Sequence, residues 1–427
     1  MVNLNSSRVG NGLRVWIYQS GEPLHQDKSD MRPMRAMNLA DELVKRGHQV
    51  TIWSSRFDHF SHLHRTEKLR KISSQLDIRL INSPGYRRNL GLGRLVDHAI
   101  LAINLKRELR MHEPPDIAFV GYPPIETAWV IKQWLKKKSV PYVVDVKDMW
   151  PHIFVTTLPE KLHRLARLLL TPYFRMMRTT LTEAKAICSI SEPFLAWAQN
   201  QSHDPRDSSF DSIAYLTSTF RDISNEDEIN LDGWLAEKVP NYATLKLISF
   251  VGSITPTFDF NTILKLAHER QDLNFVIAGG GSLYEELQEE SSEISNIFWL
   301  GWISAPQANF LIKKSLACIA PYRDEMEHGF ELSIPNKIFD AMQLGKPILL
   351  SGGGFKKDFV DVNGIGITYP SYDINKLAEA IDSLKDSNTL TTKIGSRSRE
   401  LYQREFSSNH VYEKLSEMLE AVFANEV

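Results

Sequence analysis

The chain has 427 residues and a mass of 48.9 kDa, enough for two or three domains of roughly 100–200 residues. Hydrophobic residues make up 42% and charged residues 24%, which excludes an intrinsically disordered chain. No stretch approaches ~18 consecutive apolar residues, so no membrane-spanning helix is expected. Residues 1–12 are polar, which predicts no export signal and a cytoplasmic location. Cys188 and Cys318 lie in short apolar runs, and we expect buried thiols rather than a disulfide or metal ligands.

Charge is distributed unevenly along the chain. Residues 60–190 contain 22 basic and 11 acidic residues, the remainder contains 28 basic and 41 acidic residues, and the net charge is −2. A basic segment of this size predicts an anionic partner. Nucleic acid and the cytoplasmic face of a membrane are the two candidates.

The hydrophobic pattern predicts two successive series of alternating strands and helices. The first series comprises strands at 13–18, 48–53, 77–81, 116–120, 142–146 and 186–190. An amphipathic helix over 32–46 lies between its first two strands. An acidic stretch at 222–242 separates it from strands at 245–251, 274–278, 297–300, 317–320, 347–350 and 365–369. Strands alternating with helices indicate parallel sheets, so we predict an α/β protein with two Rossmann-like domains facing across a cleft. The predicted boundaries are 1–225, 226–405, and 406–427 for a final helix packed back toward the first domain.

Loops after the predicted strands carry unusual residues, and ligands of α/β domains bind at such loops. The loop at 19–30 lacks a GxGxxG motif, which disfavours a nicotinamide dinucleotide. Arg32 and Arg35 follow it one turn apart, a pattern that fits an anion site and a solvated basic face equally well. Asp148 follows another strand, and its spacing alone indicates a loop cap. Glycines 279–281 form a turn that fits a phosphate site or a simple tight turn.

The segment 321–349 carries the most informative pattern. A polar loop leads to a helix that begins near Pro335, a residue favoured in the first helical turn. Asn336, Lys337 and Asp340 then share one face of this helix. Such a face suits a ribose diphosphate, because the cation and the helix N–H groups bind phosphates and the carboxylate accepts hydrogen bonds from ribose hydroxyls.

This helix resembles the signature of the family 4 retaining glycosyltransferases, which have the GT-B fold. In particular it resembles a subgroup with a Pro-Asn-Lys-x-Phe-Asp/Glu helix and an Ala-Gly-Lys-Pro-like turn. Other blocks are similar to the family in the same order: Leu43-Val-Lys-Arg-Gly-His-Gln-Val, Asp145-Val-Lys-Asp-Met-Trp-Pro, Ser189-Ile-Ser-Glu-Pro, Phe250-Val-Gly-Ser, Ala278-Gly-Gly-Gly and Leu300-Gly-Trp-Ile-Ser. The resemblance covers about residues 13–425.

The resemblance implies a role for each matching residue. Asp340 would bind the donor ribose, and Lys337 and Asn336 would face the diphosphate and the sugar. Residues expected near the phosphates and the base are Gly252, Ser253, Gly280, Gly301 and Trp302. Residues expected to border the acceptor are Asp148, Gly21 and Glu22. We expect Asp148 and Lys337 to be the catalytic groups.

The sequence departs from the family pattern in two places. The family's first motif glutamate corresponds to Leu332, and Glu331 is the nearest carboxylate, which leaves open whether Glu331 takes its sugar-binding place. Many members also carry an Arg…Lys pair after the Gly252 loop, and neither residue is present here. From the need for positive charge we infer that Lys337 or Arg323 supplies it.

We therefore predict a hexosyl- or N-acetylhexosaminyltransferase. By resemblance, it moves a sugar with retention from a nucleotide sugar to a glycan or polyprenyl-diphosphate-linked acceptor, in cell-surface polysaccharide synthesis. The resemblance implies no metal and no further cofactor, and the spacing reveals no carboxylate pair like that of retaining hydrolases. The alternatives are a GT-B nucleotide-sugar 2-epimerase and a non-enzymatic two-lobed binding protein. Nucleic acid is not expected as a partner, because no recognised binding motif is present.

Glu160–Leu181 is predicted to be an amphipathic helix that docks on an anionic membrane. Its five cations fall within an arc of roughly 120° and are Lys161, Arg164, Arg167, Arg175 and Arg178. Its flanks carry Leu165, Leu168, Leu169, Tyr173, Phe174, Met176 and Met177. The alternative is a core helix with a solvated basic face. The surrounding excess of positive charge and the family's polyprenyl-diphosphate acceptors favour the membrane.

Overall fold

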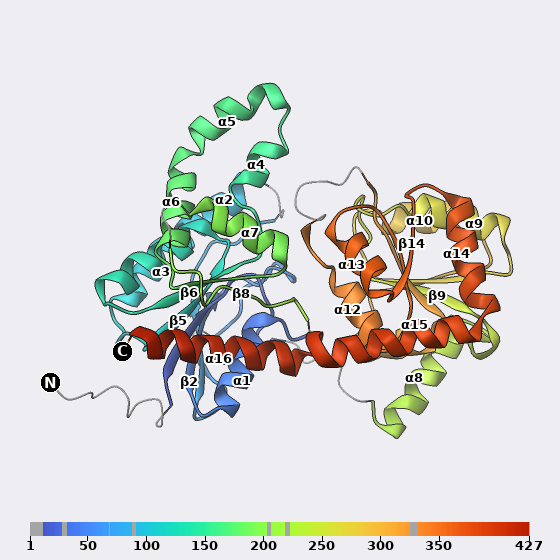
Figure 1. The fold of residues 1–427 in the computed structure, drawn as a ribbon, viewed down its shortest axis with the longest axis horizontal. Coiled ribbons are helices and arrows are strands. Elements are labelled where there is room, and N and C mark those ends of the chain that lie inside the picture. Colours follow the sequence, from blue (N-terminus) through green and yellow to red (C-terminus); the bar gives the residue numbers. More distant parts are fainter. Residues whose placement is uncertain are drawn as a thin grey trace. The chain divides into compact units, whose positions relative to one another are not determined.

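The computed structural model describes residues 12–27, 32–67, 69–87, 91–202, 206–217, 223–324 and 332–426. It divides the chain into two compact units (Figure 1). Unit 1 comprises Met1–Ser218 together with Ser408–Val427, and unit 2 comprises Thr219–Ser407. Each unit is built on a largely parallel sheet with helices packed against it, as the alternating pattern predicts.

Unit 1 contains a sheet of eight strands in the order β3-β4-β2-β1-β5-β6-β7-β8. The strands are β1 (Arg14–Tyr18), β2 (Gln49–Ser55), β3 (Leu69–Lys71), β4 (Leu76–Ile81), β5 (Ile117–Tyr122), β6 (Tyr142–Val146), β7 (Ala186–Ser189) and β8 (Ser212–Ile213). The helices are α1 (Arg35–Lys45), α2 (Leu92–Leu109), α3 (Ile125–Lys137), α4 (His152–Thr156), η2 (Glu160–Leu162), α5 (His163–Leu169), α6 (Thr171–Thr182), α7 (Glu192–Gln201) and α16 (Ser408–Glu426). Every residue of β5 and β6 is buried, as expected for central parallel strands covered on both faces.

Helix α16 returns to unit 1 from the far end of the sequence. Its apolar side chains join one hydrophobic core with those of α1, β1 and β2. At its surface Arg46 forms two hydrogen bonds, of 3.0 and 2.7 Å, with the Glu420 carboxylate. His48 contacts the same carboxylate at 2.8 Å. The last helix is therefore an integral part of the first unit.

Unit 2 contains six parallel strands in the order β11-β10-β9-β12-β13-β14. They are β9 (Leu247–Val251), β10 (Asn274–Ala278), β11 (Ile297–Gly301), β12 (Ala317–Pro321), β13 (Ile348–Ser351) and β14 (Gly366–Tyr369). The helices are α8 (Asn225–Lys238), η3 (Tyr242–Thr244), α9 (Phe260–Glu269), α10 (Tyr284–Glu290), α11 (Ala305–Lys314), α12 (Asn336–Gln343), α13 (Phe355–Asn363), α14 (Ile374–Asp386), α15 (Asn388–Leu401) and η5 (Tyr402–Phe406). Cys318 of β12 and Cys188 of β7 are buried free thiols, as predicted.

Two predictions about helices are wrong. The segment Glu160–Leu181 is not one helix, because α5 ends at Leu169 and α6 begins at Thr171. Arg35 is neither an anion site nor part of a solvated face, because it is 1% exposed. A period of 3.6 residues identified the first segment as helical, and Pro172, a residue that can kink or interrupt a helix, was its sign of a break and lies in the first turn of α6. A single arginine carries no signal of its burial.

Arg35 is part of a network of buried charges near the carboxyl ends of the unit 1 strands. Its guanidinium donates to Asp145 Oδ1 at 2.6 Å and also to the Ala214 carbonyl. Lys147 lies 3.1 Å from the other Asp145 oxygen and forms an ion pair with Glu22. Glu22 in turn accepts the backbone N–H of Ala36 at 2.8 Å, in the first turn of α1. The network contains two cations and two carboxylates, so each of its four charges has a partner of opposite sign.

We predict that Arg35→Met lowers the free energy of unfolding by about 3–5 kcal/mol, because it leaves Asp145 buried without its partner. The exposed pair of Arg14 and Asp116 provides the control, since the Arg14 side chain is 50% exposed. Arg14→Met is expected to cost less than about 1 kcal/mol. Urea denaturation of both variants measures the difference. Equal losses would contradict a structural role for the buried pair.

Candidate active site

Each sheet has a point at which the strand order reverses. In unit 2, β9 lies between β10 and β12, and in unit 1, β1 lies between β2 and β5. Loops that leave the carboxyl ends of such strands diverge, and ligands of open α/β sheets bind in the resulting crevice. The candidate residues of each unit lie on loops or helix starts at this edge.

Helix α12 brings three predicted donor residues together in unit 2. Its apolar face is buried and comprises Ile338, Phe339, Ala341 and Met342. Asn336, Lys337 and Asp340 are half-buried on the remaining surface of the first turns. The helix begins after Pro335, which has extended backbone and precedes the first turn. The N–H groups of Asn336 and Lys337, which have no acceptor within the helix, are therefore beside the three polar side chains, whereas the Ile338 N–H donates to the Pro335 carbonyl at 3.0 Å.

The Lys337 ammonium lies over the carboxyl end of β9. Its Nζ atom is 4.6 Å from the centroid of the Phe250 ring and 4.9 Å from that of Phe258. A Cβ at Gly252 would lie 2.1 Å from this Nζ, so only glycine leaves room for the ammonium. Two aromatic faces and a glycine backbone thus hold the cation at the reversal point of the sheet.

Burial dominates the electrostatics of Lys337. It lowers the pKa of the ammonium to about 8, and the carboxylate of Asp340 opposes the shift. Aromatic faces attract a cation but do not replace the water that it loses. An anionic group bound at this position would stabilise the charged form, so the site favours an anion.

We predict that Lys337→Met raises the stability of the protein at pH 7, by about 1 kcal/mol, because the mutation removes a partly desolvated charge. The lysine of the unfolded chain keeps its proton up to about pH 10.5, whereas the folded one loses it near pH 8. Between these values the unfolded state binds more protons, so wild-type stability rises with pH and the advantage of the variant shrinks.

Thermal unfolding at pH 7 and pH 10 tests this. The control is Lys265→Met, at an exposed lysine of α9, which is expected to change stability by less than about 0.5 kcal/mol at either pH. A Lys337→Met variant that is less stable than wild type at pH 7 would contradict the account of a desolvated cation.

Glycines allow the loops after β9, β10 and β11 to pack backbone against backbone. Gly279 has a positive φ, and a Cβ there would lie 1.8 Å from the Gly252 carbonyl oxygen. A Cβ at Gly281 would lie 2.1 Å from the carbonyl oxygen of Ile254. The Ile254 N–H donates to the Gly280 carbonyl at 2.9 Å, and no neighbour lies within 4 Å of the Cβ position at Gly280. The middle glycine therefore leaves open backbone beside the Lys337 site.

The remaining predicted donor residues occupy the same edge of unit 2. Ser253 is exposed directly after Gly252. Gly301 ends β11 with a positive φ, and the adjacent Trp302 indole is 75% exposed. Arg323 donates from Nε to the Phe258 carbonyl at 3.2 Å and so fixes the loop that carries that ring. Glu331 lies outside the described residues.

Unit 1 has a cavity of about 200 Å³ at its own reversal point. Gly21 and Asp148, two of the predicted acceptor residues, line it. The other lining residues are Gln19, Ser20, Ser55, Phe57, His59, Tyr86, Arg94, Asp97, His98, Leu101, Pro123, Pro124 and Lys147. The set combines aromatic rings and hydroxyl groups with one amide and several charged side chains, a composition that suits a polyhydroxylated ligand.

Asp148 is both a loop cap and a cavity residue. Its two oxygens accept hydrogen bonds from the Met149 N–H at 2.7 Å and from the Trp150 indole N–H at 3.0 Å. Burial raises the pKa of Asp148, and these hydrogen bonds and the charge of Arg94 oppose the shift. The cap that the spacing predicts therefore holds the carboxylate at the cavity wall.

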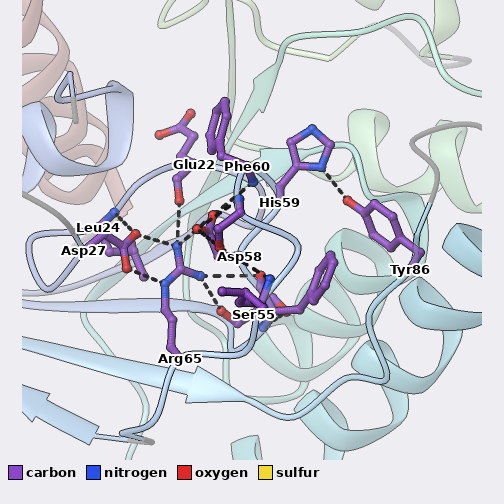
Figure 2. Close-up of polar contacts among 12 residues, drawn as sticks. Glu22, Leu24, Asp27, Ser55, Asp58, His59, Phe60, Arg65 and Tyr86 are labelled. Atoms are coloured by element: carbon purple, nitrogen blue, oxygen red, sulfur yellow. Dashed lines mark hydrogen bonds and ion pairs between the residues drawn. The ribbon is translucent and has the colours of Figure 1, made fainter. Parts of the chain in front are cut away.

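Glu22, the third predicted acceptor residue, does not line this cavity. It is 4% exposed and its two oxygens serve Lys147 and the start of α1. The loop that carries it is fixed by Arg65, which forms a double hydrogen bond to Asp27 at 2.7 and 2.6 Å (Figure 2). Arg65 also donates to the Ser55 carbonyl at 3.0 Å and thereby joins the loops after β1 and β2. Glu22 and Arg65 position the cavity wall.

Several cavity residues were not predicted from the sequence. The Arg94 guanidinium lies 5.0 Å from the Trp150 ring centroid and 5.7 Å from that of Tyr86. His59 Nδ1 contacts the Tyr86 hydroxyl at 2.6 Å (Figure 2). Burial and then the charge of Arg94 lower the pKa of His98 to about 3, so this imidazole is neutral at pH 7. Arg94, Asp97 and His98 recur at helical spacing near the start of α2, a signal that the sequence did contain.

Among the described residues, no group of three or more histidine, cysteine, aspartate or glutamate side chains is arranged to hold a metal ion. In the same part of the chain, no helix combines the length and the apolar character needed to cross a bilayer.

Two protein-family models match the chain, one in each unit. "Glycosyl transferase 4-like domain" matches residues 34–207, and "Glycosyl transferases group 1" matches residues 235–401. Each unit therefore matches a glycosyltransferase domain of the family 4 type, and the fold of the chain is GT-B. The two domain matches fall on the two sheets, so the chain carries both domains of this fold.

Individual relatives are distant. The chain is 24% identical over 152 residues to the O-antigen chain mannosyltransferase C of Escherichia coli, which is 35% of this chain and 40% of that protein. It is 22% identical over 182 residues to the poly(ribitol-phosphate) alpha-N-acetylglucosaminyltransferase of Staphylococcus aureus. This match covers 41% of this chain and 35% of that protein. The matches thus span less than half the length of either relative.

A solved structure confirms the GT-B fold over nearly the whole length of the chain. Anabaena HepE in complex with UDP and glucose superposes with a TM-score of 0.64, at 12% identity, and covers 96% of this chain and 100% of that one.

Proposed function

We propose that this chain transfers a sugar, with retention, from a nucleoside diphosphate sugar to a glycan or lipid-linked acceptor in cell-surface polysaccharide synthesis. One observation carries the proposal. At the reversal point of unit 2, the Lys337 ammonium is held between two aromatic rings and a glycine backbone without full solvation. A diphosphate supplies the negative charge that this position favours.

The surrounding residues fit the parts of a nucleotide sugar. The diphosphate is proposed to bind Lys337, Asn336 and the first N–H groups of α12. Asp340 lies one turn further along the helix and is placed to accept hydrogen bonds from the ribose hydroxyls. Gly252, Ser253 and Gly280 offer backbone and hydroxyl groups nearby. The exposed indole of Trp302 and the end of β11 are proposed to contact the base.

The comparisons support the donor class. HepE is a structural neighbour that binds UDP, and the two sequence relatives are named for mannosyl and N-acetylglucosaminyl transfer. We therefore propose a hexose or N-acetylhexosamine carried on a nucleoside diphosphate, with no further cofactor.

Charge stabilisation would provide most of the catalysis. As the bond to the diphosphate breaks, negative charge grows on the leaving oxygens, and a preorganised cation beside them lowers the barrier. Lys337 is the group of unit 2 in that position, and bound phosphate would keep it protonated. Arg323 contributes indirectly, because its hydrogen bond fixes the Phe258 loop against which the ammonium rests.

The unit 1 cavity is proposed to bind the acceptor. Asp148 there has a raised pKa and two fixed hydrogen bonds, so its carboxylate can accept a hydrogen bond, and eventually a proton, from an acceptor hydroxyl. The neutral His98 and the Tyr86 hydroxyl line the same cavity and can orient sugar hydroxyls. The lipid-linked acceptor rests on the family resemblance, and the two sequence relatives are named for an O-antigen chain and for poly(ribitol-phosphate).

We predict that Lys337→Ala and Asp340→Ala each reduce turnover by at least about 100-fold, because each removes a group that contacts the donor. The assay incubates the protein with a panel of UDP- and GDP-sugars and measures released nucleoside diphosphate, with and without a polyprenyl-diphosphate-linked acceptor. Lys376→Ala and Glu379→Ala, at an exposed ion pair of α14 with the same i, i+3 spacing, are the controls and should retain full activity.

Wild-type turnover in both α12 variants would contradict the donor site. Conversion of the sugar without acceptor and without release of nucleoside diphosphate would replace the proposal with the epimerase alternative. Donor binding without any reaction across the panel would favour a binding protein.

We predict that Asp148→Asn lowers turnover by roughly 100-fold, because an amide keeps an acceptor for the Met149 N–H but cannot take a proton. Asp373→Asn is the matched control, since Asp373 caps the start of α14 by accepting the Lys376 N–H at 2.9 Å. Steady-state kinetics with saturating donor compares the two. Full activity of Asp148→Asn would leave Asp148 only its loop-capping role.

A further inference from the structure

Residues 152–182 form an arm that extends from the sheet of unit 1 (Figure 1). This arm contains α4, η2, α5 and α6, between β6 and β7. Helix α6 packs on the core through Met177 and Leu181, but Ala166 is the one buried residue of α5. The outer part of the arm therefore makes few core contacts. It is not a core helix with a solvated basic face, the alternative that the sequence offered.

The outer part of the arm exposes a row of leucines. Their exposed fractions are 40% for Leu158, 40% for Leu162, 54% for Leu165, 70% for Leu168 and 71% for Leu169. Single exposed apolar residues are normal, but five leucines within twelve residues form a patch of the kind that contacts a partner or a membrane. Within the described residues, these leucines pack against no hydrophobic core that would account for their apolar character.

Beside the leucines the arm has a cavity of about 320 Å³. It is lined by His152, Arg167, Thr171, Phe174, Arg175 and Arg178. No carboxylate lines it, and within the described part of the chain no carboxylate oxygen lies within ion-pair distance of these three arginines. The whole arm contains five basic residues and a single acidic residue, Glu160.

His152 contributes a buried polar atom to the wall of this cavity. Its ring packs edge-on against Phe174, with centroids 4.9 Å apart, and against Trp197 at 5.4 Å. Its Nδ1 atom is buried and has no hydrogen-bond partner among the described residues. Burial, and to a lesser extent the charges of Arg167 and Arg178, lowers the pKa of His152 to about 4, so this imidazole is neutral at pH 7 and the arginines carry the positive charge of the cavity.

We propose that the arm docks on a membrane, with the phosphate group of an anionic phospholipid in the arginine cavity and the leucines of α5 in the apolar layer. Charge complementarity selects the occupant: three guanidinium groups that have no carboxylate partner among the described residues match a phosphate, and adjacent leucines match the acyl chains attached to it. A soluble nucleotide or a nucleic acid would use the arginines but would leave the leucines in water.

This docking goes beyond the proposed sugar transfer and does not depend on it. It nevertheless places the membrane near the acceptor cavity. Asp148 and His152 are four residues apart, so their Cα atoms are at most about 14 Å from each other. A lipid-linked acceptor in the docked membrane would therefore lie within reach of the unit 1 cavity.

Sedimentation with vesicles tests the proposal on the full chain. The vesicles contain phosphatidylcholine alone or mixed with phosphatidylglycerol. The variants are Arg167→Gln/Arg175→Gln/Arg178→Gln, in the cavity, and Leu165→Gln/Leu168→Gln/Leu169→Gln, on α5. The matched control removes the same charge from exposed positions of α2, of its C-cap and of α3, as Lys106→Gln/Arg110→Gln/Lys137→Gln.

Wild type should bind the mixed vesicles more tightly than the neutral ones. The arginine variant should lose about 100-fold in partition coefficient, since each surface cation contributes about fivefold, whereas the control should lose less than about threefold. The leucine variant should lose at least about tenfold on the mixed vesicles. Lysine at the three arginine positions should restore most of the binding, which separates a charge effect from misfolding.

Three results would overturn the proposal. One is failure of wild type to bind the mixed vesicles. Another is wild-type binding by the arginine variant. The third is loss of binding that the charge-matched control shares.

Two further measurements identify the other occupants. Tight binding of inorganic pyrophosphate in a titration, without vesicle binding, would assign the cavity to a soluble anion. Leucine-dependent dimers in light scattering, without vesicle binding, would assign the patch to a second copy of the chain.

Discussion

The buried ion pair between Arg35 and Asp145 is the interaction on which the architecture of unit 1 depends. Asp145 lies inside the central strand β6, and Arg35 begins the first helix, more than one hundred residues earlier in the sequence. The pair is tolerated because a second cation, Lys147, and a second carboxylate, Glu22, continue it without net charge. The loop after β1 is fixed by the same contacts, so the wall of the unit 1 cavity is set by a charge network of which Lys147 alone lines the cavity.

Three polar sites in this protein show how differently burial acts on charge. Arg35 is fully buried and remains charged because Asp145 faces it. Lys337 is held by aromatic rings, and its pKa falls to about 8. Burial, with a smaller contribution from the neighbouring arginines, lowers the pKa of His152 to about 4. Only the first is electrostatically complete without a ligand, and this distinction separates a structural cation from two candidate anion sites.

The sequence predicted two parallel α/β domains and the strands that form them, because buried parallel strands are continuous apolar runs. It also placed Lys337, Asn336 and Asp340 on one helix face, since local spacing determines which residues share a face. It could not predict that Glu22 is structural or that Arg65 ties Asp27 to the loop after β2. These contacts join residues about 40 to 125 positions apart, and no local pattern records them. The short strands β3 and β8 escaped prediction because two or three residues are too few for a period.

Helix α16 has a consequence for the order in which the protein matures. Unit 1 is discontinuous: the whole of unit 2 is synthesised before residues 408–426, whose apolar side chains complete the unit 1 core. On the ribosome, domains generally fold from the N-terminus onward, but here the first unit must wait with an exposed groove along α1 while the second is made. Biogenesis therefore runs in reverse order: unit 2 can finish its core during translation, and unit 1 can close only when the last helix has left the ribosome.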